Sequence, residues 1–159
     1  MDFYDELRGL VAALEEQHVE YAICGGVALA FHGYPRFTKD IDLLIRPAAC
    51  DRVLQIAEQQ GFLDPAGRIP FENGEVYRTS KIVGTDILTL DLLLVNTTLE
   101  DVWHDREVYG WKGLDVQVVS APGLVKMKRM AGREQDLLDI KKLESRDAED
   151  REPSGDETS

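Results

Sequence analysis

The chain has 159 residues, 43% of them hydrophobic and 8% aromatic, with a formal net charge of −12 at pH 7, as expected of one globular domain with a sizeable core. The acidic charge argues against non-specific binding to duplex DNA, because that binding depends on Lys and Arg neutralising phosphates. No apolar run approaches the roughly 18 residues that a membrane span needs, and the acidic start MDFYDELRGL does not resemble a signal peptide.

The first half of the chain predicts helices alternating with short strands. Apolar side chains recur at helical spacing over residues 3–17. Apolar runs and turn residues then predict five further elements: a strand from Tyr21 to Cys24, a helix of small residues after Gly25-Gly26, a loop from Tyr34 to Thr38, a strand from Ile41 to Ile45, and a helix that Pro47 opens and Gly61 ends.

The second half predicts two hairpins and a helical C-terminus. Residues 64–74 contain two prolines and two glycines and predict a loop. Thr97 or Thr98 is expected to cap a helix between the hairpins, and Ser120 to cap the next one. The remaining elements are a hairpin of Val76 to Val83 with Ile87 to Val95, a hairpin of Glu107 to Trp111 with Leu114 to Val119, and helices from Leu124 to Ala131 and from Arg133 to Leu143.

Together these elements predict one α/β (α+β) domain over residues 1–143, with a mixed β-sheet flanked by helices and a helical C-terminus. Residues 144–159 hold seven acids and two bases, and their polar composition predicts an acidic disordered tail. The two cysteines, Cys24 and Cys50, lie far apart and flank no metal-like spacing, which indicates reduced, buried thiols in a cytoplasmic protein.

Two aspartates share one face of a strand in the stretch TKDIDLLI. Side chains alternate along a strand, so Asp40 and Asp42 point the same way, with Cα atoms about 6.6 Å apart. Carboxylates at that separation can converge on a pair of cations, and without a cation they repel. Asp91 is the one charged residue in ILTLDLLLV and needs a partner that a metal site would supply.

Other interpretations of these three carboxylates stay open at this point. Asp40 could cap a local turn, Asp42 could pair with Arg36 or Arg46, and Asp91 could pair with a core arginine.

Two adjacent glycines, Gly25 and Gly26, lie between a predicted strand and a predicted helix. Such a junction exposes backbone N–H groups at a helix N-terminus, where a phosphate can bind. Glycine allows the phosphate to approach, because it has no Cβ in the way. The Asp40–Asp42 pair follows after 13 intervening residues.

These residues resemble the DNA polymerase β-type nucleotidyltransferase superfamily. ICGGVALAFHGYPRFTKDIDLLI is similar to its glycine pair, spacer and Asp-x-Asp signature, and TLDLLLV to its third acidic strand. Small bacterial nucleotidyltransferases, including AbiEii-type toxins of toxin–antitoxin pairs, are more similar still, and also carry a helical end like SAPGLVKMKRMAGREQDLLDIKKL. The resemblance spans roughly residues 20–143, and the chain lacks the larger C-terminal domains of many relatives.

The resemblance implies a site for two Mg²⁺ ions, or Mn²⁺ in their place, held by Asp40, Asp42 and Asp91. One ion would bind the triphosphate of a nucleotide and the other would lower the pKa of an acceptor hydroxyl, with Asp91 also a candidate general base. Gly25 and Gly26 would lie against the β- and γ-phosphates.

The resemblance further aligns Lys128 with a lysine that would neutralise triphosphate charge, although a solvated helix face is an equal alternative. Arg36 and Thr38 are loop residues that could contact phosphate. The roles of three other residues stay open: Arg133 and Asp136 can pair at i, i+3 on one helix, and His32 suits packing or hydrogen bonding better than catalysis.

The sequence therefore predicts a Mg²⁺-dependent nucleotidyltransferase that moves a nucleoside monophosphate from an NTP to an acceptor hydroxyl, as a component of a toxin–antitoxin pair with a cognate partner. The alternative is a non-catalytic, antitoxin-like or regulatory nucleotide-binding module of the same fold. A tRNA or protein acceptor is favoured over a small molecule, since the short chain leaves little room for a second pocket. Neither the acceptor, the preferred NTP nor the oligomeric state follows from the sequence.

Overall fold

The computed structural model describes residues 1–71 and 74–151, with the backbone alone for 64–71, 74 and 146–151. Its centre is a seven-stranded mixed sheet with the strand order β3-β4-β5-β2-β1-β7-β6. The pairs β2–β5 and β1–β7 are parallel, and the other neighbours are antiparallel. The strands are β1 Ala22–Cys24, β2 Asp40–Ile45, β3 Leu63–Phe71, β4 Gly74–Val83, β5 Asp86–Leu94, β6 Glu107–Trp111 and β7 Leu114–Val118.

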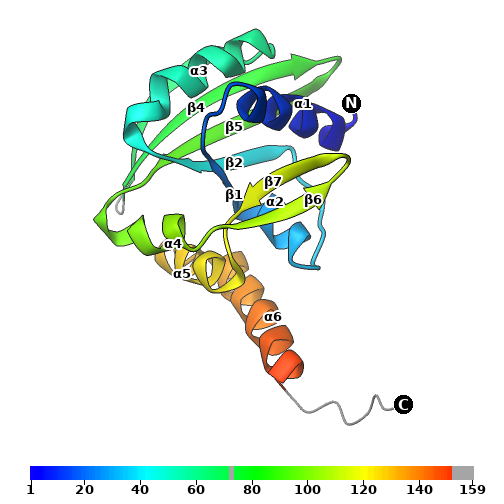
Figure 1. The fold of residues 1–159 in the computed structure, drawn as a ribbon, viewed down its shortest axis with the longest axis vertical. Helices are drawn as coiled ribbons and strands as arrows, with labels where there is room; N and C mark the ends of the chain where they lie inside the picture. Colours follow the sequence, from blue (N-terminus) through cyan, green and yellow to red (C-terminus); the bar gives the residue numbers. More distant parts are fainter. Residues whose placement is uncertain (72–73, 152–159) are drawn as a thin grey trace.

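Helices cover both faces of this sheet. In Figure 1, α1 and α3 lie together on one side, while α4, α5 and α6 lie on the other and α6 leads away to the C-terminus. The mixed sheet with flanking helices confirms the predicted fold class. The helices are α1 Phe3–Glu16, α2 Gly25–Phe31, α3 Cys50–Gln59, α4 Glu100–His104, α5 Ala121–Ala131 and α6 Glu134–Arg151, with short 3₁₀ turns η1 Pro47–Ala49 and η2 Thr97–Leu99.

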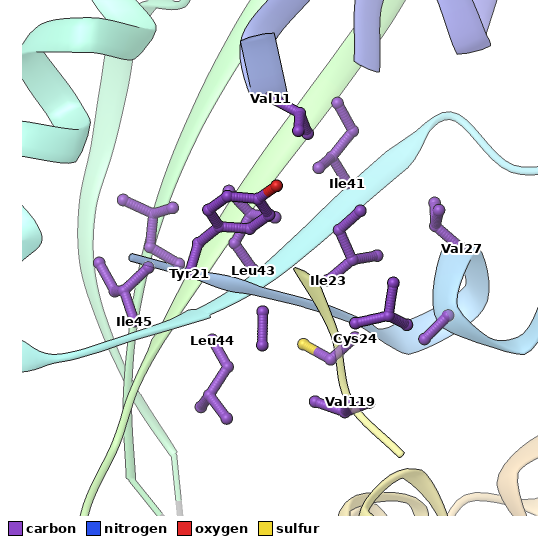
Figure 2. Packing of buried hydrophobic residues seen from close by; sticks show 14 of the residues in the cluster. Val11, Tyr21, Ile23, Cys24, Val27, Ile41, Leu43, Leu44, Ile45 and Val119 are labelled. Carbon is purple, nitrogen blue, oxygen red and sulfur yellow. The ribbon is translucent and has the colours of Figure 1, made fainter. Parts of the chain in front are cut away.

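The pleat of the central strands sorts their side chains into two layers. Ile23 and Ile41 project toward Val11 of α1, whereas Cys24 and Leu44 project to the opposite side (Figure 2). All five side chains are buried. The sheet is therefore covered on both faces at its centre, and Asp40 and Asp42, which alternate with Ile41, belong to the face opposite α1.

Residues 64–71 and 74 do not form the predicted loop, and 72–73 lie outside the described residues. Residues 64–71 form most of β3 and Gly74 begins β4, and the two strands pair antiparallel with a register shift between Leu63 and Gly67. The expectation was wrong because β3 is an edge strand, where prolines are tolerated because they remove no ladder hydrogen bond on the open side.

Two other local expectations differ from the structure. The cap before η2 is Asn96, whose Oδ1 accepts a hydrogen bond from Leu99 N at 3.0 Å, rather than Thr97 or Thr98. Helix α6 continues to Arg151, past the predicted end at Leu143. The remainder of the predicted tail, 152–159, lies outside the described residues. The Ser120 cap is confirmed, since its Oγ accepts from Gly123 N at 3.1 Å.

Both cysteines are unpaired and buried, as expected. Within the described residues, no helix combines the length and the apolar character needed to cross a membrane.

Candidate active site

One row of side chains crosses four neighbouring strands on the face opposite α1. In the parallel pair β2–β5, Asp42 lies directly opposite Asp91. Cys24 of β1 lies opposite Asp42 on one side, and Arg78 of β4 lies opposite Asp91 on the other. Directly opposed residues share a face with short separations between their Cβ atoms, so the sheet itself brings two acids from distant parts of the chain together.

This row forms the floor of a cavity of about 450 Å³. The cavity lies between the sheet and the C-terminal helices, because residues of α5 and α6 complete its lining. All eight residues that the sequence singled out as catalytic, phosphate-binding or metal-binding line it: Gly25, Gly26, Arg36, Thr38, Asp40, Asp42, Asp91 and Lys128.

Gly25 is required by the position of Asp42. Its φ is +65°, a left-handed conformation that side chains disfavour. A Cβ built on Gly25 would lie 2.1 Å from Asp42 Oδ2, closer than any real contact. The carboxylate therefore lies directly against the Gly25 backbone. Gly26 has a different neighbour, because its Cβ would meet the Arg36 guanidinium at 3.6 Å.

Asp42 is the most perturbed acid of the cavity. Burial raises its pKa most, the negative charges of Asp91 and Asp40 raise it further, and together they bring it to about 7 against the weaker opposing charges of Arg133 and Lys128. In the described part of the chain, no basic side chain forms an ion pair with Asp40 or Asp42.

The alternative partners considered for Asp42 are therefore wrong. Arg36 pairs with Asp139 and Arg46 pairs with Glu100.

Asp91 has a strong partner in Arg78. Arg78 Nε donates to Asp91 Oδ1 at 2.7 Å, and Arg78 Nη2 donates to Oδ2 at 3.1 Å. From the sequence, one alternative was that Asp91 pairs with a core arginine. Asp91 does pair with an arginine, but the Arg78 side chain is 45% exposed rather than buried, whereas Asp91 is 14% exposed. Both oxygens of the third acid are thus occupied by a guanidinium at the cavity wall.

Lys128 and Arg36 are held by Asp139 of α6. Lys128 Nζ donates to Asp139 Oδ2 at 2.9 Å, and Arg36 Nη1 donates to both Asp139 oxygens at 3.0 and 2.8 Å. The Lys128 side chain is 5% exposed and that of Asp139 is fully buried. The solvated-face interpretation of Lys128 is therefore wrong.

Two opposing influences act on Asp139. Burial alone would raise its pKa, but hydrogen bonds from Lys128 and Gln135 and the charges of Lys128 and Arg36 outweigh burial and lower it.

The remaining candidates have mainly structural partners. Thr38 Oγ1 accepts from Asp40 N at 3.0 Å, which fixes the entry into β2. Arg133 donates from Nε to Asp136 Oδ2 at 2.6 Å, the i, i+3 pairing considered from the sequence. His32 Nε2 bonds to the Val119 carbonyl at 2.8 Å, as a hydrogen-bonding rather than a catalytic residue would.

The cavity also has features that the sequence interpretation missed. Arg78 and Asp139 were not assigned to the site. Arg78 binds Asp91, and Asp139 holds the side chains of Lys128 and Arg36. An apolar wall was missed as well, formed by Val76, Leu93, Leu94, Leu99, Leu124, Met127 and Met130. Apolar side chains of this kind can pack against the flat face of a bound ring.

The chemistry of the acids fits a hard divalent cation. Three carboxylates of one cavity supply the oxygen ligands that Mg²⁺ takes, and the mutual repulsion that raises the Asp42 pKa is the strain a cation would relieve. Among the side chains that the structure describes, however, no three His, Cys, Asp or Glu residues already converge as a metal-binding group. Asp40 and Asp42 have free oxygens, whereas Asp91 would first have to leave Arg78.

The fold is that of nucleotidyltransferases. A putative nucleotidyltransferase from Thermotoga maritima has a TM-score of 0.65 at 14% identity, covering 91% of this chain and 94% of that one. The lincosamide antibiotic adenylyltransferase LnuA, solved with lincomycin bound, has a TM-score of 0.60 at 19% identity, covering 89% and 96%. The antibiotic-resistance factor ANT(2'')-Ia has a TM-score of 0.57 at 16% identity, covering 93% and 95%.

The chain belongs to the AbiEii family, described as the nucleotidyl transferase AbiEii toxin of a type IV toxin–antitoxin system, whose family model matches residues 7–102. The match covers more than half of the chain and includes the glycine pair and the three aspartates, while Lys128 and α6 lie beyond it. No curated protein sequence matches the chain.

Proposed function

We propose that this protein transfers a nucleoside monophosphate from an NTP to an acceptor hydroxyl, with the help of divalent cations and with release of pyrophosphate. The observation that carries the proposal is the cavity in which Asp42 lies against Gly25 and opposite Asp91. Asp42 and Asp40 lack a basic partner among the described side chains, and the Gly25 backbone lies directly against Asp42. A nucleotide that carries bound Mg²⁺ is therefore favoured electrostatically at this place.

In this proposal Asp40 and Asp42, joined by Asp91, hold the cations, which would supply charge neutralisation at the triphosphate and a more acidic acceptor hydroxyl. The acceptor oxygen forms a bond to the α-phosphorus, the bond from that phosphorus to the bridging oxygen breaks, and the electrons leave with pyrophosphate. The hydroxyl proton passes to a carboxylate of the cavity, for which Asp91 is the candidate once Arg78 has released it.

Gly25, Gly26, Arg36 and Thr38 line the part of the cavity proposed for the β- and γ-phosphates. Lys128 adds positive charge from α5. Both Lys128 and Arg36 are held in place by Asp139, so they are oriented before the nucleotide arrives. The apolar wall of the cavity is the proposed contact for the nucleobase.

The family description supports a cognate antitoxin as partner. For the acceptor, the argument that the chain is too short for a small molecule fails, because LnuA, 96% of which is covered, was solved with lincomycin bound. RNA, protein and small-molecule acceptors are therefore separate arms of the test below, and the non-catalytic alternative predicts no labelled product in any of them.

The test is incubation of the protein with each α-³²P-labelled NTP and Mg²⁺, together with total RNA, lysate protein, or an antibiotic carrying free hydroxyls. We expect one labelled product class. Asp42→Asn should lower its formation by roughly a hundredfold or more, since losing a cation ligand costs several kcal/mol of transition-state stabilisation and each 1.36 kcal/mol is tenfold.

Asp86→Asn is the matched control. It removes the same kind of charge at the start of the same sheet's β5, where Asp86 pairs with Lys39 outside the cavity, and should leave the rate unchanged. Equal transfer by wild type and Asp42→Asn would refute the proposed function.

A further inference from the structure

Arg78 occupies an unusual position among the cations of the cavity. Four basic side chains of the described residues line it: Arg36, Arg78, Lys128 and Arg133. Three of them are held by Asp136 and Asp139 of α6 rather than by Asp40, Asp42 or Asp91. Of the four, Arg78 alone pairs with one of these three strand aspartates, and it binds both oxygens of Asp91.

The register of the sheet makes this pairing direct. Arg78 and Asp91 are opposed across β4 and β5, and Asp91 and Asp42 are opposed across β5 and β2. The guanidinium thus approaches Asp91 from the side away from Asp42. It offsets the negative charge of Asp91, as a bound cation would, through two charge-assisted hydrogen bonds.

The two partners differ in how easily they can move. Asp91 is 14% exposed and fixed in a central strand, whereas the Arg78 side chain is 45% exposed. The half-exposed guanidinium can move into water, but the carboxylate that it leaves is nearly buried. Its departure therefore costs little only when a bound cation takes its place on Asp91.

Resting on the cation site of the proposed function, we infer that Arg78 is an internal stand-in for the divalent cation: it occupies Asp91 while the site is empty, gives up the carboxylate when the cation binds, and then turns to the polyphosphate. The released guanidinium is a five-donor fork that suits phosphate oxygens. The same residue therefore opposes cation binding in the absence of nucleotide and supports polyphosphate binding in its presence.

This dual role predicts two effects of opposite sign for Arg78→Gln. Without nucleotide, Mn²⁺ titrated into the full-length protein and followed by electron paramagnetic resonance should bind about tenfold more tightly than to wild type, because the competitor for Asp91 is gone. At saturating Mg²⁺, inorganic tripolyphosphate measured by calorimetry should bind about tenfold more weakly, because one two-point phosphate contact is lost.

Lys81→Gln is the matched control. Lys81 lies three residues along β4, on the other face, where it pairs with Glu6 of α1. The substitution changes the net charge equally, so it reproduces any long-range electrostatic effect on both titrations. Only differences between Arg78→Gln and Lys81→Gln count for the inference.

If Arg78→Gln binds Mn²⁺ no more tightly than Lys81→Gln, Arg78 does not compete with the cation for Asp91. If the two variants bind tripolyphosphate equally, the released Arg78 does not bind the polyphosphate. Either result overturns the inference. A purely structural Arg78 would lower both affinities together, which also overturns it. The proposed function fails separately: if Arg78→Gln shows both effects while wild type labels no acceptor with any NTP, the site binds as inferred but does not transfer. If wild type labels an acceptor and Arg78→Gln shows neither effect, the inference alone is wrong.

Discussion

At the scale of single residues, the contact with Asp42 leaves no room for a side chain at Gly25. The effect of this collision can be separated from the effect of backbone strain, because Gly84 has nearly the same φ as Gly25, +64° against +65°. A Cβ on Gly25 would collide with the Asp42 carboxylate, whereas one on Gly84 meets nothing within 4 Å. The strain of an alanine at positive φ is therefore common to both positions, and the collision is not.

We expect Gly84→Ala to lower the free energy of unfolding by roughly 1 kcal/mol and to leave nucleotide transfer intact. Gly25→Ala should lose at least as much stability and, in addition, most of its transfer activity, since Asp42 must move. Urea unfolding and the labelling assay measure the two effects. Equal activity in both variants would show that Asp42 does not need its place against Gly25.

The raised pKa of Asp42 gives a prediction for pH. A carboxyl whose folded pKa is about 7 rather than 3.8 binds more protons in the folded than in the unfolded state between those values. Its contribution to stability therefore declines as pH rises from about 4 to about 7 and is level above that. The cause is burial first, then repulsion from Asp91 and Asp40.

Other acids titrate in the same range, so a difference is measured. The unfolding free energy of wild type minus that of Asp42→Asn, in EDTA, should fall by a few kcal/mol at most between pH 4 and 7, since one pKa unit corresponds to about 1.36 kcal/mol. A flat difference across that range would mean that Asp42 ionises like a solvated carboxyl.

At the scale of elements, the described side chains join α6 to α5 by two buried ion pairs, both made by Lys128, and by one exposed ion pair. Lys128–Asp139 has side chains 5% and 0% exposed, whereas Arg129–Glu144 has side chains 58% and 55% exposed. The Lys128–Asp139 pair also connects α6 to the loop before β2, because Arg36 binds the same carboxylate. Breaking a buried pair from one side leaves a charge uncompensated, and breaking an exposed one does not.

Asp139→Asn should therefore cost about 3 kcal/mol or more of unfolding free energy, and Glu144→Gln less than about 1 kcal/mol. Chemical denaturation of the two variants side by side measures this. Asp136, 3.6 Å from Lys128, remains as a partial substitute. Similar small losses in both variants would show that Asp136 compensates fully and that α6 does not depend on Asp139.

Much of this arrangement was accessible from the sequence, and the successes have a common origin. Period-two alternation placed Asp40 and Asp42 on one face, and the apolar context of Asp91 demanded a partner. The Arg78–Asp91 pair could have been predicted too, because a hairpin turning at Gly84 and Thr85 sets Val83 opposite Asp86 and hence Arg78 opposite Asp91. Those inferences use local periodicity and register only.

What the sequence interpretation could not supply depends on docking between distant elements. Asp139 meets Arg36 across 103 residues of chain, and no local pattern indicates that α6 folds back on the loop before β2. The prolines and glycines of residues 64–74 predicted a loop because their tolerance in a strand depends on that strand lying at the sheet edge. Edge position is a property of the whole topology.

At the scale of the whole molecule, the chain carries net charge −12 and brings Asp40, Asp42 and Asp91 into one cavity. A cation and a nucleotide that bind only the folded state should therefore stabilise the entire cooperative unit. At about 100 times its dissociation constant, such a ligand adds roughly 2.7 kcal/mol, or roughly 5–10 °C in melting temperature for a domain near this size.

The measurement is a thermal melt in EDTA, in Mg²⁺, and in Mg²⁺ with each NTP, at constant ionic strength so that general screening of the acidic surface is the same throughout. We expect the largest rise for Mg²⁺ with one preferred NTP. Asp40→Ala and Asp42→Ala should lose most of that rise and keep or exceed the wild-type melting temperature in EDTA, because one repelling charge is gone. Asp86→Asn, outside the cavity, should keep the full rise.

If no combination of metal and NTP raises the wild-type melting temperature, while the cavity variants are badly destabilised in EDTA, the aspartates serve the fold rather than a ligand. In that case the repulsion around Asp42 would have to be balanced by contacts other than a bound cation.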